Sequence, residues 1–143
     1  MITLQNIQLS CKVIIYYPFL LGTIMSRYIL DESKIHASIR STISNNHRDF
    51  VEEIITVVES NSLVIIGMGI NPVCKSACKF LTKKGLDFEY LEYGSYFKEW
   101  RKRNALKMWT GWKTFPMVFV NGVLIGGAED LYRLINSNEF EQI

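Results

Sequence analysis

Residues 62–85 read SLVIIGMGINPVCKSACKFLTKKG. The run Leu63–Ile66 is short, apolar and rich in β-branched side chains, and glycines follow it, which predicts a buried strand entering a loop. Asn71 is a favourable helix N-cap, and proline suits the helical position that comes next. We therefore expect a helix over Pro72–Lys84, with Gly85 as its C-terminal stop.

The rest of the C-terminal half alternates between strand and helix patterns. Phe88, Tyr90 and Leu91 mark a second strand, Tyr96–Trp109 a helix, Met117–Val120 a third strand, Val123–Ile125 a fourth strand and Ala128–Asn136 a last helix. Between the last two strands, Asn121-Gly122 is a strong signal for a two-residue hairpin. The order strand–helix–strand–helix–strand–strand–helix predicts an α/β fold, with a four-stranded mixed sheet flanked by helices on both faces.

Two helical patterns precede this region. Asp31–Ser44 is predicted as a short helix, and Asp49–Ser60 as a longer one whose residues Phe50, Ile54, Val57 and Val58 share a face. Asp49 and Glu52 resemble a capping box at the start of the longer helix. We therefore divide the chain into residues 1–24, a helical extension over 25–60 and an α/β domain over 61–138.

Residues 1–24 allow three interpretations. Val13–Met25 is largely apolar, but it is too short to span a membrane. The segment is interpreted as a tail or read-through upstream of a start at Met25, as a targeting segment, or as a packed strand. A targeting segment would send the protein to an organelle, although Gly22–Met25 is a poor signal-peptide cleavage site.

The amino-acid composition limits the classes of function that we expect for the protein. The 143 residues carry a formal net charge of +2, which favours neither nucleic acid nor a strongly acidic partner. The basic residues at 98, 101–103 and 107 are interpreted as a solvated helix face rather than as a binding patch. Three cysteines are too few for a disulfide scaffold, so we expect a cytoplasmic protein without a membrane partner.

Several motifs resemble those of the glutaredoxin family, and the resemblance covers about half of the chain. Thr114-Phe115-Pro116 is similar to the family's Thr-Val-Pro segment, whose proline is cis, and Gly126-Gly127-Ala128-Glu129-Asp130 is similar to its double-glycine turn. Residues 109–113 also look like the family, and somewhat like its monothiol branch. Asn71-Pro72-Val73-Cys74 stands where the family has its Cys-Pro-Tyr-Cys motif. The resemblance implies a thioredoxin-like (glutaredoxin) fold.

The resemblance also implies a glutathione site. The backbone of Phe115 beside Pro116 would pair with glutathione as a short added strand, and the helix N-terminus after Gly127 would hold the γ-glutamyl carboxylate. Glu129 and Asp130 would take the ammonium group, and Lys113 or Lys107 would meet the glycine carboxylate. The glutathione-binding residues expected from this resemblance are Asn71, Val73, Lys113, Phe115, Pro116, Gly127, Ala128 and Glu129.

The active-site segment departs from the family pattern. In the register set by the apolar residues of the helix, Asn71 replaces the attacking cysteine and Cys74 the second one. Asn71 preserves the cap but supplies no sulfur. Cys74 is the candidate catalytic residue, because a thiol in the first turn of a helix can have a lowered pKa. Structural and redox roles stay open for Cys74, whereas Cys78, one turn further on, is interpreted as a semi-buried small residue.

Three functions are consistent with these residues. The first is a glutathione-linked thiol–disulfide oxidoreductase acting through Cys74 on glutathionylated or disulfide-bearing proteins. The second is a non-catalytic glutaredoxin-fold module that binds glutathione, an iron–sulfur cluster or a protein partner. The third is a structural domain whose partner surface is the helical extension. We expect no metal ligand set, because His36 and His47 lack ligand spacing.

Overall fold

The computed structural model describes residues 27–137 and 139–140. The chain divides into two units, residues 1–34 and residues 35–143. In the first unit the described residues hold one short 3-10 helix, η1 (Glu32–Lys34). The interpretations of residues 1–24 lie outside the described residues. Within the described part, no helix combines the length and the apolar character that crossing a membrane requires.

The second unit carries the sheet and the α-helices. Its elements are α1 (Ala37–Ser44), α2 (Arg48–Ser60), β1 (Leu63–Gly67), α3 (Pro72–Lys84), β2 (Glu89–Glu92), α4 (Trp100–Thr110), β3 (Met117–Val120), β4 (Val123–Gly126) and α5 (Ala128–Asn136). From β1 onward this is the predicted order, and the α/β fold class is confirmed.

The four strands form one mixed sheet in the order β2-β1-β3-β4. β1 runs parallel to β2, with Val64 opposite Glu89, and antiparallel to β3, with Leu63 opposite Val120. β3 and β4 form the predicted hairpin, with Asn121 and Gly122 at its tip. The register places the hairpin tip beside the start of β1, and the loop to α3 at the opposite end of the sheet.

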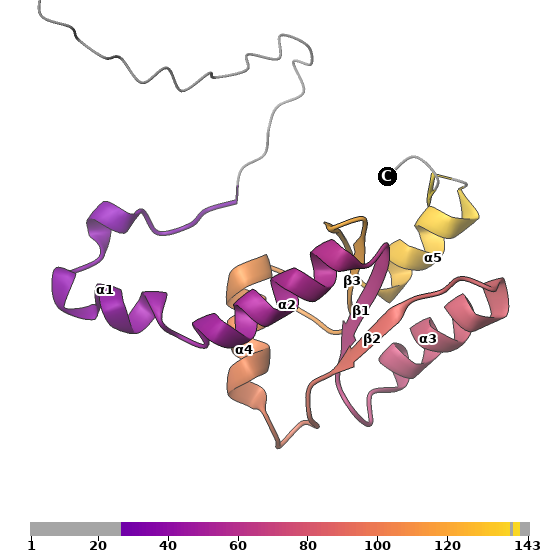
Figure 1. Ribbon diagram of the computed structural model, residues 1–143, viewed down its shortest axis with the longest axis horizontal. Helices are drawn as coiled ribbons and strands as arrows, with labels where there is room; N and C mark the ends of the chain where they lie inside the picture. Colours follow the sequence, from indigo (N-terminus) through magenta and orange to yellow (C-terminus); the bar gives the residue numbers. More distant parts are fainter. Residues whose placement is uncertain (1–26, 138, 141–143) are drawn as a thin grey trace, which may run out of the picture. The chain divides into compact units, whose positions relative to one another are not determined.

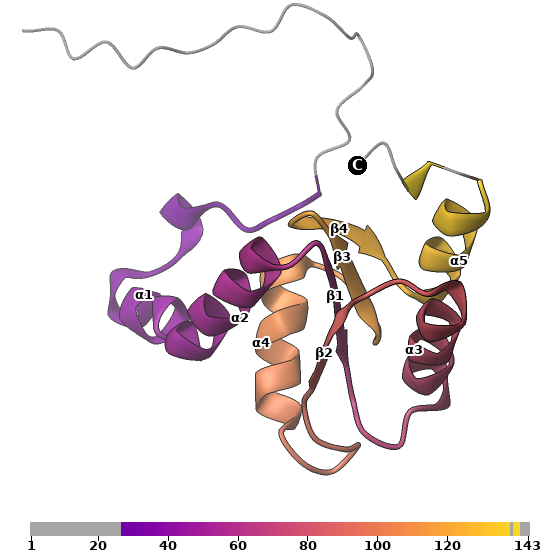
Figure 2. The same ribbon diagram turned by 45° about the vertical axis from the view of Figure 1, so that its right-hand side comes forward.

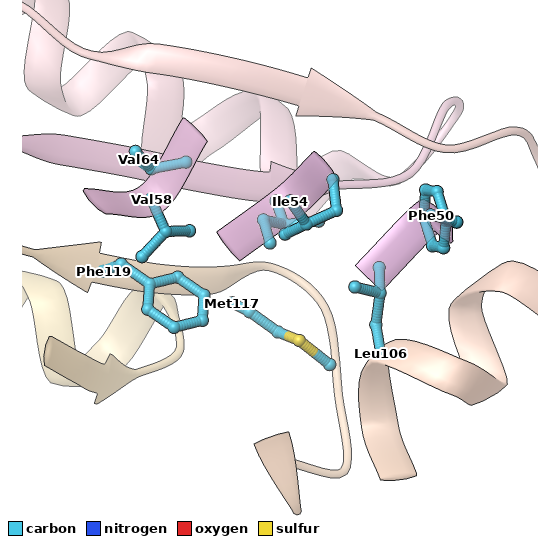
Figure 3. Packing of buried hydrophobic residues seen from close by; sticks show 8 residues of the cluster. Phe50, Ile54, Val58, Val64, Leu106, Met117 and Phe119 are labelled. Carbon is cyan, nitrogen blue, oxygen red and sulfur yellow. The ribbon is translucent and has the colours of Figure 1, made fainter. Parts of the chain in front are cut away.

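Helices cover both faces of the sheet (Figure 1, Figure 2). α2 and α4 lie on one face, and α3 and α5 on the other. The first face buries the cluster of Phe50, Ile54, Val58, Val64, Ile66, Leu106, Met117 and Phe119, most of which are labelled in Figure 3. The second buries Leu63, Ile65, Ala77, Leu81, Val118, Val120, Ala128 and Leu131. Every residue of β1 is buried, as expected for a central strand covered on both faces.

The predicted face of α2 is part of this core. Phe50, Ile54 and Val58 are buried and Val57 is partly buried, so the helix packs on the sheet through its apolar side. The capping box predicted from Asp49 and Glu52 is wrong. α2 begins after His47, which has no side-chain cap, and the Glu52 carboxylate accepts instead from Arg48 Nε at 2.8 Å.

The helix predicted over residues 31–44 is divided in two. The Asp31 carboxylate accepts from the backbone N–H of Ser33 at 2.8 Å and so closes a turn at η1 instead of a longer helix. α1 starts only at Ala37, after His36 accepts from the backbone N–H of Ser38 at 3.3 Å.

α4 begins at Trp100, four residues later than predicted. Gly94 and Glu99 both adopt left-handed backbone conformations, which interrupt a right-handed helix. The buried Arg103 guanidinium donates to the backbone carbonyls of Tyr93, Tyr96 and Lys98. These bonds hold the segment before Trp100 as a loop.

Candidate functional site

The first turn of α3 is capped as the sequence predicts. Asn71 Oδ1 accepts from the backbone N–H of Val73 at 2.9 Å and of Cys74 at 3.4 Å, and Pro72 is the first helical residue. Asn71 is partly buried and stands at the sheet end where β1 passes into the helix. Its side chain therefore serves the helix backbone, which accounts for an asparagine at this position.

Cys74 lies in this first turn but points into the protein. Its exposed fraction is 0%. Burial raises the pKa of the Cys74 thiol, and hydrogen bonding to the backbone of Met68 and of Cys74 itself offsets only part of this effect. The negative charge of Glu92 raises the pKa further. The pKa lowering expected for a cysteine near a helix N-terminus is thus wrong for Cys74, because desolvation outweighs the helix dipole.

The surroundings of Cys74 also disfavour a thiolate. A Cβ atom on Gly67 would stand 2.6 Å from Tyr90 Oη, so the phenol packs directly over this glycine. The pKa of Tyr90 is raised, first by burial and then by the charges of Cys74, Glu92 and Cys78. Among the described residues, no cation is a cause of the shift at Cys74.

Cys78 follows one turn later in α3 and is partly exposed. Its pKa is raised by burial and by the nearby Cys74, so it too is protonated at neutral pH. Cys74 and Cys78 are both free thiols. The described residues hold no group of three or more His, Cys, Asp and Glu side chains placed to bind a metal ion.

A cavity of about 300 Å³ opens beside the cis Phe115–Pro116 peptide bond. It is lined by Val73, Trp112, Thr114, Phe115, Pro116, Gly127, Ala128, Glu129 and Asp130. Six of the expected glutathione-binding residues are brought together here, namely Val73, Phe115, Pro116, Gly127, Ala128 and Glu129. Asn71, Lys113 and Cys74 are not part of its wall.

One end of the cavity is the N-terminus of α5. Gly127 is the N-cap residue and has no side chain to satisfy the N–H groups of the first helical turn. Asp130 Oδ2 accepts from the Gly127 backbone N–H at 2.9 Å, so this carboxylate is already used as a cap. Glu129 is exposed in the cavity wall and is the free carboxylate at this end.

Trp112 forms a further part of the wall, and sequence analysis assigned it no role. Its indole edge packs on Gly127, with Nε1 at 3.7 Å and Cζ2 at 3.6 Å from the place a Cβ atom would take. Trp112 Nε1 is the only buried side-chain nitrogen or oxygen among the described residues that has no hydrogen-bond partner. A buried donor without an acceptor is unfavourable. The sequence feature that could have identified this part of the site is a tryptophan four residues before Pro116.

Of the two lysines expected to meet a carboxylate, Lys107 contacts a residue of the cavity wall. Lys107 Nζ lies 5.7 Å from the centre of the Phe115 ring, and Phe115 lines the cavity. Lys113 is exposed and does not contribute to the wall.

Comparisons with known proteins agree on one family. The family model described as Glutaredoxin matches residues 72–125. A glutaredoxin-like protein of Dictyostelium discoideum is 42% identical over 99 residues, which are 69% of this chain and 80% of the relative. Mitochondrial glutaredoxin-2 of Rattus norvegicus is 36% identical, and the match covers 59% of this chain and 54% of the rat protein.

Solved structures give the same result for the fold. The wheat glutaredoxin structure matches with a TM-score of 0.53 and 30% identity over 60% of this chain and 81% of the wheat chain. The buckwheat glutaredoxin–glutathione complex matches with a TM-score of 0.60 and 22% identity, over 68% of this chain and 89% of that one. The thioredoxin-like fold predicted from the sequence is therefore confirmed.

Proposed function

The chain belongs to the glutaredoxin family, and from this premise we propose that it binds glutathione in the cavity beside Pro116. In this proposal it is a glutaredoxin-like protein of the glutathione-linked thiol oxidoreductase family with an atypical active site. Its wild-type form holds glutathione chiefly without a covalent bond. The observation that carries the proposal is the wall itself, in which Phe115 and Pro116 face the first turn of α5 across one cavity.

The polar groups of the cavity suit the two ends of a γ-glutamyl tripeptide. The N–H groups of Ala128 and Glu129 would hold the γ-glutamyl carboxylate, since a helix N-terminus attracts an anion. The Glu129 carboxylate would meet the adjacent ammonium. The backbone of Phe115 would pair with the cysteinyl residue, and Lys107 is close enough to this segment to meet the glycine carboxylate. Lys113 remains a candidate for the same carboxylate.

The sulfur of a bound glutathione would face the start of α3. In the family register this position belongs to Asn71, whose amide caps the helix and cannot attack a disulfide. Val73 lines the cavity at this end and would contact the cysteinyl side chain. In this proposal the cavity supplies groups for recognising glutathione, and the described residues that line it include no thiol for reacting with it.

A second candidate function is slow thiol–disulfide exchange through Cys74. It is favoured by the position of Cys74 directly after Val73, in the first turn of α3. The Cys74 thiolate would attack the glutathionyl sulfur of a mixed disulfide and release the partner as a thiol. A second glutathione thiolate would then attack this new disulfide, which restores Cys74 and releases glutathione disulfide. Burial of Cys74 and its raised pKa both oppose the first step.

The described residues do not fit an iron–sulfur cluster. Clusters are held by accessible thiolates. Here Asn71 stands where the resemblance expects the attacking cysteine, and the Cys74 thiol is fully buried with a raised pKa.

Calorimetric titration with reduced glutathione tests the binding proposal. Wild-type protein should bind, and Glu129→Lys should lose most of the affinity, because a cation would replace the carboxylate that meets the ammonium. Glu59→Lys is the matched control, since Glu59 is also exposed but lies near the end of α2 outside the cavity wall.

Glutathione-linked reduction of a small mixed disulfide then separates the two candidates. Binding without turnover supports the non-catalytic module, whereas turnover that Cys74→Ser abolishes supports exchange through Cys74. A wild-type protein with neither binding nor turnover would contradict both candidates.

We also propose a cytoplasmic protein whose partners are glutathionylated or disulfide-bearing proteins. An organelle is the alternative if residues 1–24 are a targeting segment, and the rat relative is named as mitochondrial. Subcellular fractionation with the intact mass of the native protein tests both points. Recovery from an organelle with a shortened N-terminus would contradict the cytoplasmic location.

A further inference from the structure

The loop between β2 and α4, together with the first residue of α4, presents three aromatic side chains to solvent. Phe97 is 94% exposed, Tyr96 61% and Trp100 53%. We call these three residues the aromatic rim. Large apolar side chains that gather on one surface segment mark an interaction site more often than isolated ones do.

The backbone that carries the aromatic rim is firmly held. Arg103 is only 7% exposed, and its guanidinium donates to the carbonyls of Tyr93 at 3.0 Å and Tyr96 at 3.3 Å, and to that of Lys98. Gly94 is in the left-handed region, and a Cβ atom there would lie 2.6 Å from the Lys98 carbonyl oxygen. The loop thus presents its aromatic side chains from an ordered backbone, which lowers the entropy cost of binding.

The aromatic rim lies at the same end of the sheet as the cavity. The backbone N–H of Gly69 donates to the Gly94 carbonyl at 2.6 Å, so the β2–α4 loop is bonded to the β1–α3 loop. Both views show these two loops together at one end of the molecule (Figure 1, Figure 2). The β1–α3 loop and the start of α3 carry two further exposed apolar side chains, Ile70 at 72% and Val73 at 47%, and Val73 also lines the cavity.

Lys98 and Arg101 supply positive charge beside the aromatic rim, whereas the Glu92 carboxylate stands near Gly69. Lys102 pairs with Glu99 at 3.1 Å, whereas Lys98 and Arg101 are exposed and make no ion pair within the described residues. The Arg101 guanidinium stands 5.5 Å from the centre of the Trp100 ring. Tyrosine, tryptophan and arginine are the residues most enriched at the energetic centres of protein interfaces.

We propose that the aromatic rim docks an acidic protein segment whose cysteine carries glutathione, while the glutathione itself occupies the cavity. This inference rests on the proposed glutathione site and adds the chemistry of the macromolecular partner. Lys98 and Arg101 select acidic side chains, and Phe97 and Trp100 pack on an apolar one. A membrane surface is the weaker occupant, because basic segments that recognise anionic lipids carry about 4–8 available Lys or Arg residues, whereas here Lys102 is paired with Glu99 and Arg103 is buried.

Thioether conjugates test the docking without any redox step. One short peptide links its cysteine to glutathione between Leu and Glu residues, and a second carries Lys in place of Glu. S-methylglutathione reports the cavity alone. Wild-type protein should bind the acidic conjugate about tenfold more tightly than S-methylglutathione, and the preference should weaken with added salt.

Variants of the aromatic rim separate docking from the cavity. Phe97→Ser and Trp100→Ser should each remove most of the gain for the acidic conjugate, and Arg101→Glu should shift the preference toward the basic one. All three should leave binding of S-methylglutathione unchanged. Val123→Ser is the matched control, because Val123 is 55% exposed but stands at the hairpin end of the sheet, away from the aromatic rim.

Each outcome bears on one of the two proposals. If S-methylglutathione binds and both conjugates bind no better, the docking inference is overturned and the glutathione site stands. If the acidic conjugate binds, the rim variants abolish this binding and S-methylglutathione does not bind at any concentration, the rim holds the peptide alone, and both the glutathione site and the proposed joint docking are overturned. No binding by any probe overturns both proposals. Co-sedimentation with phosphatidylglycerol vesicles that Phe97→Ser abolishes, without a preference among conjugates, overturns docking in favour of a lipid surface.

Discussion

Replacing Asn71 by cysteine should give the protein the thiol that its helix terminus lacks. The side chain of Asn71 stands at the N-cap of α3, where N–H groups of the first turn already meet its oxygen. A thiol at such a helix terminus has a pKa of about 3.5–7.5. Asn71→Cys should therefore convert a glutathione-binding cavity into a glutathione-linked disulfide reductase.

The expected gain in turnover follows from the thiolate fractions of Cys74 and of the cysteine introduced at position 71. Because burial raises the pKa of Cys74 above the ordinary value of about 8.5, at most a few per cent of Cys74 is thiolate at pH 7. A thiol in the helix-terminal range is about one quarter thiolate or more at the same pH. The introduced thiol would also be partly exposed, as Asn71 is, whereas the Cys74 thiol is fully buried. We expect at least a tenfold rise in turnover of a small glutathione mixed disulfide.

The assay couples glutathione disulfide release to reduction by glutathione reductase and follows NADPH consumption. Asn71→Ser is the matched control, because serine preserves a cap oxygen and supplies no thiol. Asn71→Cys should cost about 1 kcal/mol of stability through the weakened cap. The reasoning is refuted if Asn71→Cys remains folded, binds glutathione and still turns over no faster than Asn71→Ser.

Three further perturbations have defined outcomes. Trp112→Phe should weaken glutathione binding, measured by calorimetry, because the indole forms part of the cavity wall and packs on Gly127. Thermal stability should not fall through a lost hydrogen bond, since Nε1 has no partner in the free protein; unchanged affinity would remove Trp112 from the site. Burial raises the folded-state pKa of Cys74, so its contribution to stability is complete below about pH 8.5 and falls as the pH rises, because the unfolded chain releases the proton first. Urea unfolding across pH 7.5–10 should show this fall, and an equally steep fall in Cys74→Ala would exclude Cys74 as a cause. Leu106→Ala should cost about 2–5 kcal/mol in the same unfolding assay, because the side chain is fully buried between α4 and the sheet; a cost below 1 kcal/mol would contradict that packing.

The sequence correctly predicted the helices and turns whose ends are set by a capping residue, a proline or a glycine. Asn71 with the following proline marked the start of α3, and Gly85 adopts the left-handed conformation that ends it. Asn121 and Gly122 predicted the hairpin, and both have positive φ. In these cases the residues that set the backbone geometry are adjacent in the sequence.

The predictions from the sequence were wrong or incomplete where a contact between residues distant in the sequence determines the structure. The start of α4 depends on Arg103, whose side chain reaches back to carbonyls five to ten residues earlier. The thiol chemistry of Cys74 depends on the burial that α3 acquires against the sheet, which position in the first helical turn does not reveal. Trp112 belongs to the cavity only because α5 brings Gly127 beneath its indole.

Amide chemical shifts of the labelled protein during titration with reduced glutathione locate the ligand. The amides of Phe115, Ala128 and Glu129 should shift in a saturable manner, while that of Gly122 at the hairpin tip should not move. Saturable shifts confined to these cavity residues are the result we predict. Shifts that are absent, or that gather around Met108 of α4, which is outside the cavity wall, would contradict a glutathione site beside Pro116.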